Sequence, residues 1–225
     1  MPAQVFYDLN MCAATNDLTA AARIRETATR LFAERGAAAV TIREIASASG
    51  VSPSLVMHHY GSKDGLKEAV DRRATALVEG FFSEVADSAH GGVTAPSLAA
   101  ALADRLEQEP LLPAYLRRLL VDGGPPAESV FHAMFAATVS GLEALEAAGL
   151  VRPAIENRVR AAFLLVNDLA LVLLREQIRC VLGVDPLSKA GMPRWTAEVL
   201  DVYEHGVFIG GAAAPGRDAA AWERS

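Results

Sequence analysis

Residues 52–55 carry side chains and a helix start that could bind a polyanion. Ser52, Pro53, Ser54 and Leu55 place serine at an N-cap and proline in the first turn, which predicts the beginning of a helix. Such a helix end offers hydroxyl groups, free backbone amides and a partial positive charge to phosphate groups. A short helix can also enter the major groove of DNA with this end leading. The segment therefore favours nucleic-acid binding.

A second short helix is predicted immediately before this one. Thr41 and Glu44 have the spacing of a capping box, and Gly50 permits the tight turn that ends the helix. Ala46 is small where the two helices must pass closely. A compact core beneath them can form from three aliphatic side chains, Ile45, Val51 and Val56. Together these features predict a helix-turn-helix.

The remainder of the chain is predicted to be helical as well. Apolar periodicity predicts a helix from Thr19, as its cap, to Gly36, and a long helix from about Lys63 to Ala89. Proline and glycine breaks then delimit helices near 95–108, 111–121, 126–148, 154–182 and 195–209. We expect an all-α fold of about nine helices. Its predicted parts are a flexible N-terminus (1–17), a three-helix helix-turn-helix domain (18–65), a larger helical domain reached through the long helix (66–209) and a flexible tail (210–225).

Composition and charge restrict the classes of protein that fit. Hydrophobic residues make up 52% of the 225 residues and charged residues 21%, as in globular proteins. The net charge is −6, yet residues 18–75 hold nine Lys and Arg against six Asp and Glu. This asymmetry fits a basic DNA-binding segment on an acidic body, although chance variation would also produce it. The first residues lack the pattern of a signal peptide, and the apolar stretch 161–174 is too short to span a bilayer, which predicts a cytoplasmic protein.

An enzyme is the main alternative class. The sequence contains no GxSxG, glycine-rich phosphate loop or HExxH motif, and its two cysteines cannot form a Cys-rich metal site. We therefore expect no catalytic residue, cofactor or metal. Catalysis by scattered residues, or a helical module for protein contacts, stays open as an alternative. DNA binding with a steep salt dependence would separate the regulator from both.

The segment TIREIASASGVSPSLVMHHYGSKDGL resembles the DNA-binding part of TetR-type (tetracycline-repressor-like) transcriptional regulators. The resemblance extends from Thr19 to about Ala76 and includes the preceding helix, the aromatic Tyr60 and the G-S-K turn. The C-terminal two thirds fit the family in length and helical content only. The resemblance implies a homodimeric repressor that binds a palindromic operator and is released by a small, largely apolar effector. It also implies that the target is an efflux or catabolic gene.

Residue roles follow from this resemblance position by position. It implies DNA contacts for nine residues: Thr41, Arg43, Ser52, Pro53, Ser54, Leu55, His58, His59 and Lys63. Simpler roles stay open, since Thr41 could only cap its helix, and Arg43 and Lys63 could be solvated cations. One of the two histidines could also pack in the core, as Tyr60 is expected to do. Met57 stands where many members carry a tyrosine that touches phosphate, so affinity is expected to depend more on His58, His59 and Lys63.

Asn167 and Asp168 interrupt an otherwise apolar helix in the C-terminal region. A buried carboxylate is costly without a partner. The two residues could form a polar pair at a helix–helix interface, satisfied by Arg160 or Arg175, or they could anchor an effector. We expect an effector pocket from side chains of mixed polarity: Tyr115, His132, Phe135, Thr138, Phe163 and Asn167.

The last two predicted long helices carry more apolar residues than one core face requires. This surplus, together with the resemblance, predicts a dimer interface at Leu164, Leu171, Leu174, Ile178, Val199, Val202 and Val207. A two-fold dimer would present two recognition helices about 34–36 Å apart to a palindromic site.

Overall fold

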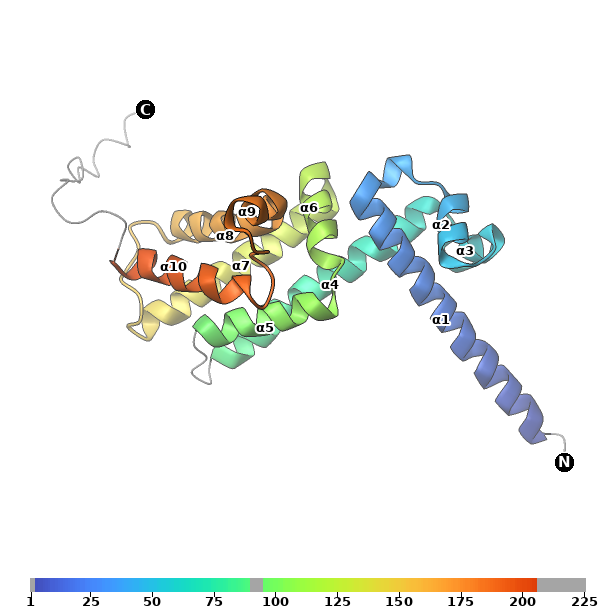
Figure 1. Cartoon of the computed structure of the whole chain (residues 1–225). Coiled ribbons are helices and arrows are strands. Elements are labelled where there is room, and N and C mark those ends of the chain that lie inside the picture. The colour runs from blue at the N-terminus through green and yellow to red at the C-terminus, as the bar shows by residue number, and fades with distance from the viewer. Residues whose placement is uncertain (1–2, 90–94, 206–225) are drawn as a thin grey trace.

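The computed structural model describes residues 3–89 and 95–205, with side chains described for 19–84 and 100–205. Within these ranges the regular structure is entirely helical, which confirms the predicted fold class (Figure 1). The elements are α1 (Ala3–Arg35), η1 (Ala37–Ala39), α2 (Ile42–Ser49), α3 (Pro53–Tyr60), α4 (Lys63–Ala89), α5 (Ala95–Gln108), α6 (Leu112–Asp122), α7 (Pro125–Ala147), α8 (Asn157–Leu173), α9 (Arg175–Leu182) and α10 (Gly191–His205). The predicted tail 210–225 lies outside the described residues.

The helix-turn-helix forms as the sequence predicts. Thr41 and Glu44 make the complete capping box at the start of α2, and Gly50 ends this helix in the left-handed conformation with φ 66°. The backbone amide of Val51 donates to the carbonyl oxygen of Ala46 across the turn at 3.0 Å. Ile45 and Val56 are fully buried beneath α2 and α3. Local capping and this small core therefore fix the angle between the two helices.

The first helix begins earlier than the sequence predicts. α1 runs from Ala3, so Thr19 lies inside the helix and is not its N-cap. Residues 3–17, for which the sequence predicts a flexible N-terminus, are part of α1 in the structure. Figure 1 shows this early part of α1 projecting beyond the helix-turn-helix. The end of α1 agrees with the prediction, since Arg35 is its last residue and Gly36 follows.

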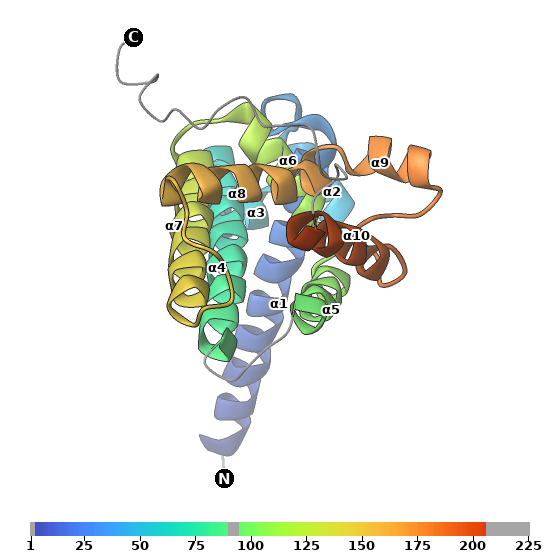
Figure 2. The same cartoon turned by 90° about the vertical axis from the view of Figure 1, so that its left-hand side faces the viewer.

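α4 connects the helix-turn-helix to the helical body formed by α5–α10. One continuous core extends along this connection, from Ile24 and Phe32 in α1 through Val70 in α4 to Val130 in α7. Figure 2 shows α4 and α7 side by side, with α8 crossing them. No helix among the described residues is both long and apolar enough to cross a membrane.

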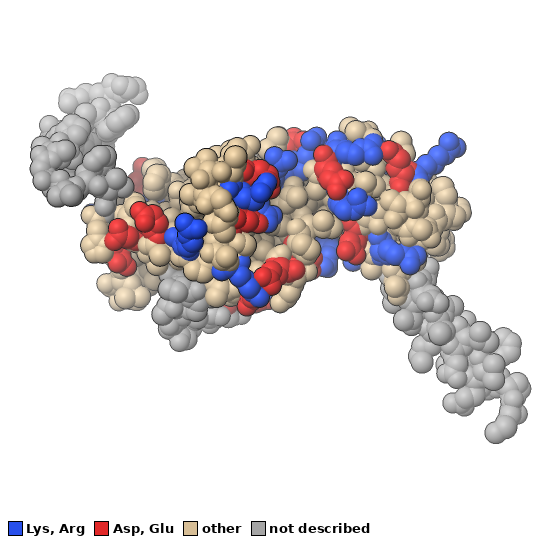
Figure 3. All heavy atoms as spheres, in the orientation of Figure 1, with Lys and Arg blue, Asp and Glu red and all other residues tan. Residues whose placement is uncertain are grey.

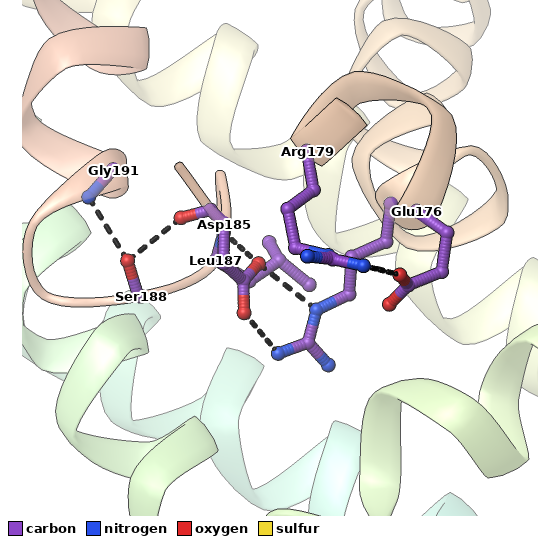
Figure 4. Close-up of polar contacts among 7 residues, drawn as sticks. Glu176, Arg179, Asp185, Leu187, Ser188 and Gly191 are labelled. Atoms are coloured by element: carbon purple, nitrogen blue, oxygen red, sulfur yellow. Dashed lines mark hydrogen bonds and ion pairs between the residues drawn. The ribbon is translucent and has the colours of Figure 1, made fainter. Parts of the chain in front are cut away.

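A smaller second core lies where α5, α8 and α10 approach one another. It contains Ala103, Leu171, Leu187 and Met192. Its position depends on the connection between α9 and α10, which is held by polar contacts around one carboxylate (Figure 4).

Asp185 organises that connection. Arg175 donates to both of its carboxylate oxygens, which lowers the pKa of Asp185, and the backbone amide of Leu187 donates to Oδ1 at 3.1 Å. Ser188 Oγ donates to the carbonyl oxygen of Asp185 at 2.7 Å. A Cβ atom at position 191 would lie only 2.0 Å from that same oxygen, so the start of α10 requires Gly191.

The single helix predicted over 154–182 was wrong. The structure divides this region into α8 and α9, with a break at Leu174, where φ is −109° and ψ is 19°. No glycine or proline marks this break in the sequence. Directly after the break, Arg175 pairs with Asp185, and this contact ties the first residue of α9 to the α9–α10 connection.

Candidate nucleic-acid interface

α3 lies at the end of the molecule far from the body (Figure 1), and residues 52–54 at its N-terminal end are exposed. Ser52 caps the helix, because its Oγ accepts a hydrogen bond from the backbone amide of Leu55 at 3.2 Å. Ser52 Oγ also lies 2.8 Å from Ser54 Oγ. Ser52, Pro53 and Ser54 are exposed, whereas Leu55 is half-buried. The predicted recognition positions therefore share one accessible helix end.

Two arginines lie near the start of α2: Arg35 of α1, which pairs with Glu44, and Arg43 of α2 itself. Thr41 donates to Glu44 Oε2 through its amide at 2.7 Å and its hydroxyl at 2.8 Å. These contacts and Arg35, which donates to Oε1 at 2.8 Å, lower the pKa of the Glu44 carboxyl to about 2. Arg43 is exposed and makes no ion pair with any described residue. Its guanidinium is thus available to a phosphate group.

The C-terminal end of α3 packs through Tyr60. Its hydroxyl donates to the carbonyl oxygen of Ala21 in α1 at 2.7 Å, and burial raises the pKa of Tyr60. His58 is exposed and His59 half-buried, with ring centroids 5.5 Å apart. The structure therefore gives Tyr60 the packing role expected for it and presents His58 to solvent.

Lys63, the first residue of α4, has a structural contact. Its ammonium group donates to the carbonyl oxygen of Ala37 at 3.0 Å and is half-buried. This bond ties the end of η1 to the start of α4. An ammonium group has three donors, so this contact leaves two for other acceptors.

The charged side chains near α3 lie on either side of it. Figure 3 shows mostly uncharged atoms over α3, with Lys and Arg atoms above and below them and some Asp and Glu atoms beside these. In protein–DNA complexes, cationic side chains bind the phosphate backbone and set orientation, and the side chains in the groove read bases. The arrangement fits this division.

The body residues predicted to line an effector pocket are not brought together. Tyr115 is buried beneath α4, where its hydroxyl donates to Asp71 Oδ1 at 2.6 Å. His132 is exposed on α7, Phe135 contacts the guanidinium of Arg158, and Thr138 Oγ1 donates to the carbonyl oxygen of Met134 in its own helix. Phe163 is 64% exposed. One pocket lined by all six residues is therefore absent from the described part of the chain.

Asn167 and Asp168 have other neighbours than those predicted. Asn167 donates to the hydroxyl of Tyr203 in α10 at 3.2 Å. Arg160 donates instead to backbone carbonyl groups, and Arg175 pairs with Asp185. Desolvation of its carboxyl raises the pKa of Asp168 to about 6, although the residue as a whole is exposed.

The predicted interface residues occupy several environments. Leu171 is only 6% exposed and belongs to the second core, so the structure contradicts the prediction that it lies at a dimer interface. Ile178 packs against that same core, and Val207 lies outside the described residues. Leu174 is exposed, whereas Leu164, Val199 and Val202 are half-buried.

An exposed apolar stripe on α8 was missed by the sequence reasoning. It consists of Val159, Phe163 and Val166, each more than half exposed. Their spacing of i, i+4 and i+7 places them on one helix face, and this spacing is the signal that could have identified the stripe. We call this set the α8 stripe.

Two clefts in the body could hold small molecules. One, of about 360 Å³, lies between α5 and α10 and is lined mainly by apolar side chains, with Lys189 and Asp104 also contributing. The other, of about 310 Å³, lies between α1, α4 and the α5–α6 connection and has a mixed polar and apolar lining that includes Tyr115. None of the other five predicted pocket residues lines either cleft.

The fold and this interface define a helix-turn-helix, DNA-binding transcriptional regulator. Residues 24–70 match the family model of bacterial regulatory proteins of the tetR family, and residues 107–209 match a tetracycline repressor-like C-terminal domain. The chain belongs to the tetR family, as the sequence resemblance indicated. Members of the family are transcriptional regulators and not enzymes.

Relatives in sequence and structure agree with this assignment. The HTH-type transcriptional regulatory protein RaaS of Mycobacterium tuberculosis is 37% identical over 153 residues, which cover 67% of this chain and 68% of that protein. A gamma-butyrolactone receptor (ArpA-like protein) shares the fold with a TM-score of 0.65 at 22% identity, over 85% of this chain and 89% of that one. Thermus thermophilus FadR, solved in complex with lauroyl-CoA, has a TM-score of 0.53 at 22% identity, over 87% and 99%.

Proposed function

We propose that this ligand-responsive DNA-binding regulator is a cytoplasmic homodimeric repressor that binds a palindromic operator. In this proposal a small, largely apolar effector binds the body and releases the DNA, and the regulated gene encodes an efflux or catabolic protein. The observation that carries the DNA-binding part is the accessible N-terminal end of α3, flanked by cations. The dimer and the effector site rest on separate features of the body.

The α8 stripe supports the dimer. Val159, Phe163 and Val166 form an apolar surface that a monomer would leave in water. Tyr203 of α10 is also exposed and lies beside α8, since its hydroxyl accepts from Asn167. Association through two α8 helices would bury these side chains and join two copies of the helix-turn-helix into one two-fold DNA-binding unit.

The cleft between α5 and α10 is the site that we propose for the effector. Its walls include Ala103, Met192, Ala197 and Leu200, and these small and apolar side chains suit an apolar molecule. Lys189 at the cleft pairs with Asp104 and Glu107 of α5. An effector can release DNA only through different affinities for two arrangements of the helices. Thermus thermophilus FadR was solved with lauroyl-CoA, and the acyl part of that ligand is apolar like the molecule proposed here.

Filling this cleft tests the effector site. Ala197→Phe places a ring in the cleft, and Ala136→Phe adds the same ring at an exposed position of α7 as the control. The probe is N-phenyl-1-naphthylamine, a neutral apolar fluorophore. We expect tight probe binding by the wild type and the control and at least tenfold weaker binding by Ala197→Phe. Equal affinities for all three would place the effector elsewhere.

DNA binding is tested by fluorescence anisotropy with DNA from upstream of the protein's own gene, against a scrambled duplex. Selective binding that weakens steeply with salt, at two protomers per site, is the expected result. Light scattering of the free protein reports its oligomeric state. Absence of selective binding, both here and in a selection from random sequences, would overturn the operator-binding proposal. A reporter gene behind the operator separates repression from activation.

Lys63→Ala is expected to weaken binding to all DNA sequences alike and to flatten the salt dependence by about one unit per protomer. The physical reason is loss of one phosphate contact from the start of α4. Anisotropy at several salt concentrations measures it. Arg179→Ala is the control, because Arg179 pairs with Glu176 on α9, away from α3. Since Lys63 also bonds Ala37, thermal melting must accompany the titration. An unchanged salt slope would remove the phosphate role.

Stability is expected to depend on pH through Asp168. Its folded-state pKa of about 6 exceeds the usual value of 3.8, so the folded protein binds the proton more tightly than the unfolded chain. Stability from this group is therefore present at pH 4 and is lost as pH rises to about 6. Asp168→Asn should raise the Tm at pH 7.5 by about 2–4 °C, for a gain of about 1 kcal/mol after allowance for solvent access.

The same substitution should change the Tm little at pH 4.5, where the carboxyl is already protonated. Glu143→Gln, on the exposed surface of α7, is the control and should have little effect at either pH. Scanning calorimetry at both pH values measures these differences. An equal Tm change for Asp168→Asn at the two pH values would contradict a desolvated carboxyl.

A further inference from the structure

The side chains that α3 presents to solvent lack the groups that most often read DNA bases. Pro53, Ser54, Met57 and His58 are exposed and lie on one helix face. α3 contains no Arg, Lys, Asn or Gln. Paired hydrogen bonds to guanine from Arg or Lys, and to adenine from Asn or Gln, are therefore unavailable from this helix. The base-reading chemistry of α3 must come from a hydroxyl, an imidazole and an apolar side chain.

Met57 is the large apolar side chain of this face. It is 45% exposed, while the next residue toward the N-terminus, Val56, is fully buried in the core. Met57 lies one turn after Pro53 and Ser54, so it follows the leading end of α3 along the same face. The side chain takes no part in the two described core clusters. Met57 is one of several large apolar residues that are exposed in the single chain, so its side chain is accessible to another molecule.

The apolar feature that base edges present in the major groove is the 5-methyl group of thymine. We propose that Met57 contacts the 5-methyl group of one thymine in each operator half-site and thereby determines sequence specificity. This proposal rests on the proposed operator binding. A thioether side chain is flexible and polarizable, so it can adapt to a methyl group in the groove without precise hydrogen-bond geometry.

The chemistry of the Met57 side chain, unlike that of the tyrosine that many family members carry at this position, favours a base contact over a phosphate contact. A thioether is neutral, has no hydrogen-bond donor and is only a weak acceptor, so it cannot bind a phosphate group. Lys and Arg atoms lie above and below α3 (Figure 3). Arg43 of α2 is exposed and available to the DNA backbone. Phosphate binding at both flanks would hold the uncharged face of α3, with Met57 on it, toward the base edges.

Deoxyuridine scanning tests the proposal, because uracil differs from thymine only by the absent methyl group. Thymines of a selected operator are replaced one symmetric pair at a time, and affinity is measured by anisotropy. We expect one pair whose replacement weakens wild-type binding about 15-fold, because loss of each of the two methyl groups weakens binding about fourfold. Met57→Ala should bind the thymine operator with a similar loss and should not distinguish thymine from uracil at that pair.

Two variants provide the controls. Met57→Leu keeps an apolar side chain and should preserve most of the preference for thymine. His58→Ala changes a neighbouring residue of the same face and should preserve the preference even where its overall affinity falls. Because Met57 is exposed, Met57→Ala should melt like the wild type, which excludes misfolding as the cause.

The outcomes separate this inference from the proposed function. Selective wild-type binding with no thymine whose methyl group matters would overturn the role of Met57. A Met57→Ala variant that keeps the full preference for thymine over uracil would overturn it as well. Wild-type protein that binds no operator selectively would instead overturn the proposed function and the inference with it.

Discussion

Phe163→Glu is expected to leave the chain folded, convert the proposed dimer into a monomer and weaken operator binding at least 100-fold. Phe163 is the largest member of the α8 stripe and is 64% exposed in the single chain, so its replacement costs little in the monomer. At a two-fold interface the two glutamates would lie near each other in an apolar surface, where unpaired charges are strongly unfavourable. A monomer would contact one half-site only, and so would lose the contacts that the second α3 makes.

Light scattering and anisotropy together measure this result. Val121→Glu is the matched control, since Val121 is another exposed apolar residue but lies on α6, outside the α8 stripe. It should remain dimeric and bind DNA like the wild type. Circular dichroism and melting curves confirm that each variant is folded. A Phe163→Glu protein that is still dimeric at micromolar concentration would show that the α8 stripe is not the dimer interface.

Asp71→Ala should lower the free energy of unfolding by about 3 kcal/mol, which corresponds to a fall in Tm of roughly 6–12 °C. Asp71 on α4 is buried and accepts two hydrogen bonds, from Tyr115 of α6 at 2.6 Å and from Lys67 at 2.7 Å. Without the carboxylate, the Tyr115 hydroxyl would be buried with no partner. Burial and the bond to Asp71 also raise the pKa of Tyr115, which keeps it a donor.

Chemical denaturation with a matched series of variants measures this effect. Tyr115→Phe removes one hydrogen bond but leaves Asp71 paired with Lys67, so a smaller loss of about 1 kcal/mol is expected. Glu68→Ala is the control, because Glu68 is an exposed residue of α4 that pairs with Arg72 at 3.5 Å. It should change stability by less than about 0.5 kcal/mol. If Asp71→Ala melted like the control, the buried contact would contribute nothing to stability.

The helix-turn-helix could be predicted because its signals are local. The capping box of Thr41 and Glu44 and the N-cap of Ser52 each involve groups three residues apart. Gly50 supplies a backbone conformation that depends on its own residue type. Such features act within a few residues of the chain, so they can be interpreted before any packing is known.

The body could not be predicted in the same way. Leu171 and Phe163 are both apolar residues of α8, yet one is buried in the second core and the other is exposed on the α8 stripe. Apolar periodicity identifies a helix face, but it does not say whether that face meets the same chain or another one. The predicted pocket failed for the same reason, because its candidates were chosen by residue type from helices whose packing was unknown.

The sequence by itself determined the helical class, the order of most helices and the capped N-terminal end of α3, because capping groups and turn residues act within about one helical turn. Only the tertiary structure decided the break at Leu174, the bond between Asp71 and Tyr115, and the cleft between α5 and α10. The bond between Arg175 and Asp185 after this break joins residues 10 positions apart, and the bond between Asp71 and Tyr115 joins residues 44 positions apart. The cleft lies between the first and the last helix of the body. Their partners are selected by packing of the whole chain, which no local pattern records.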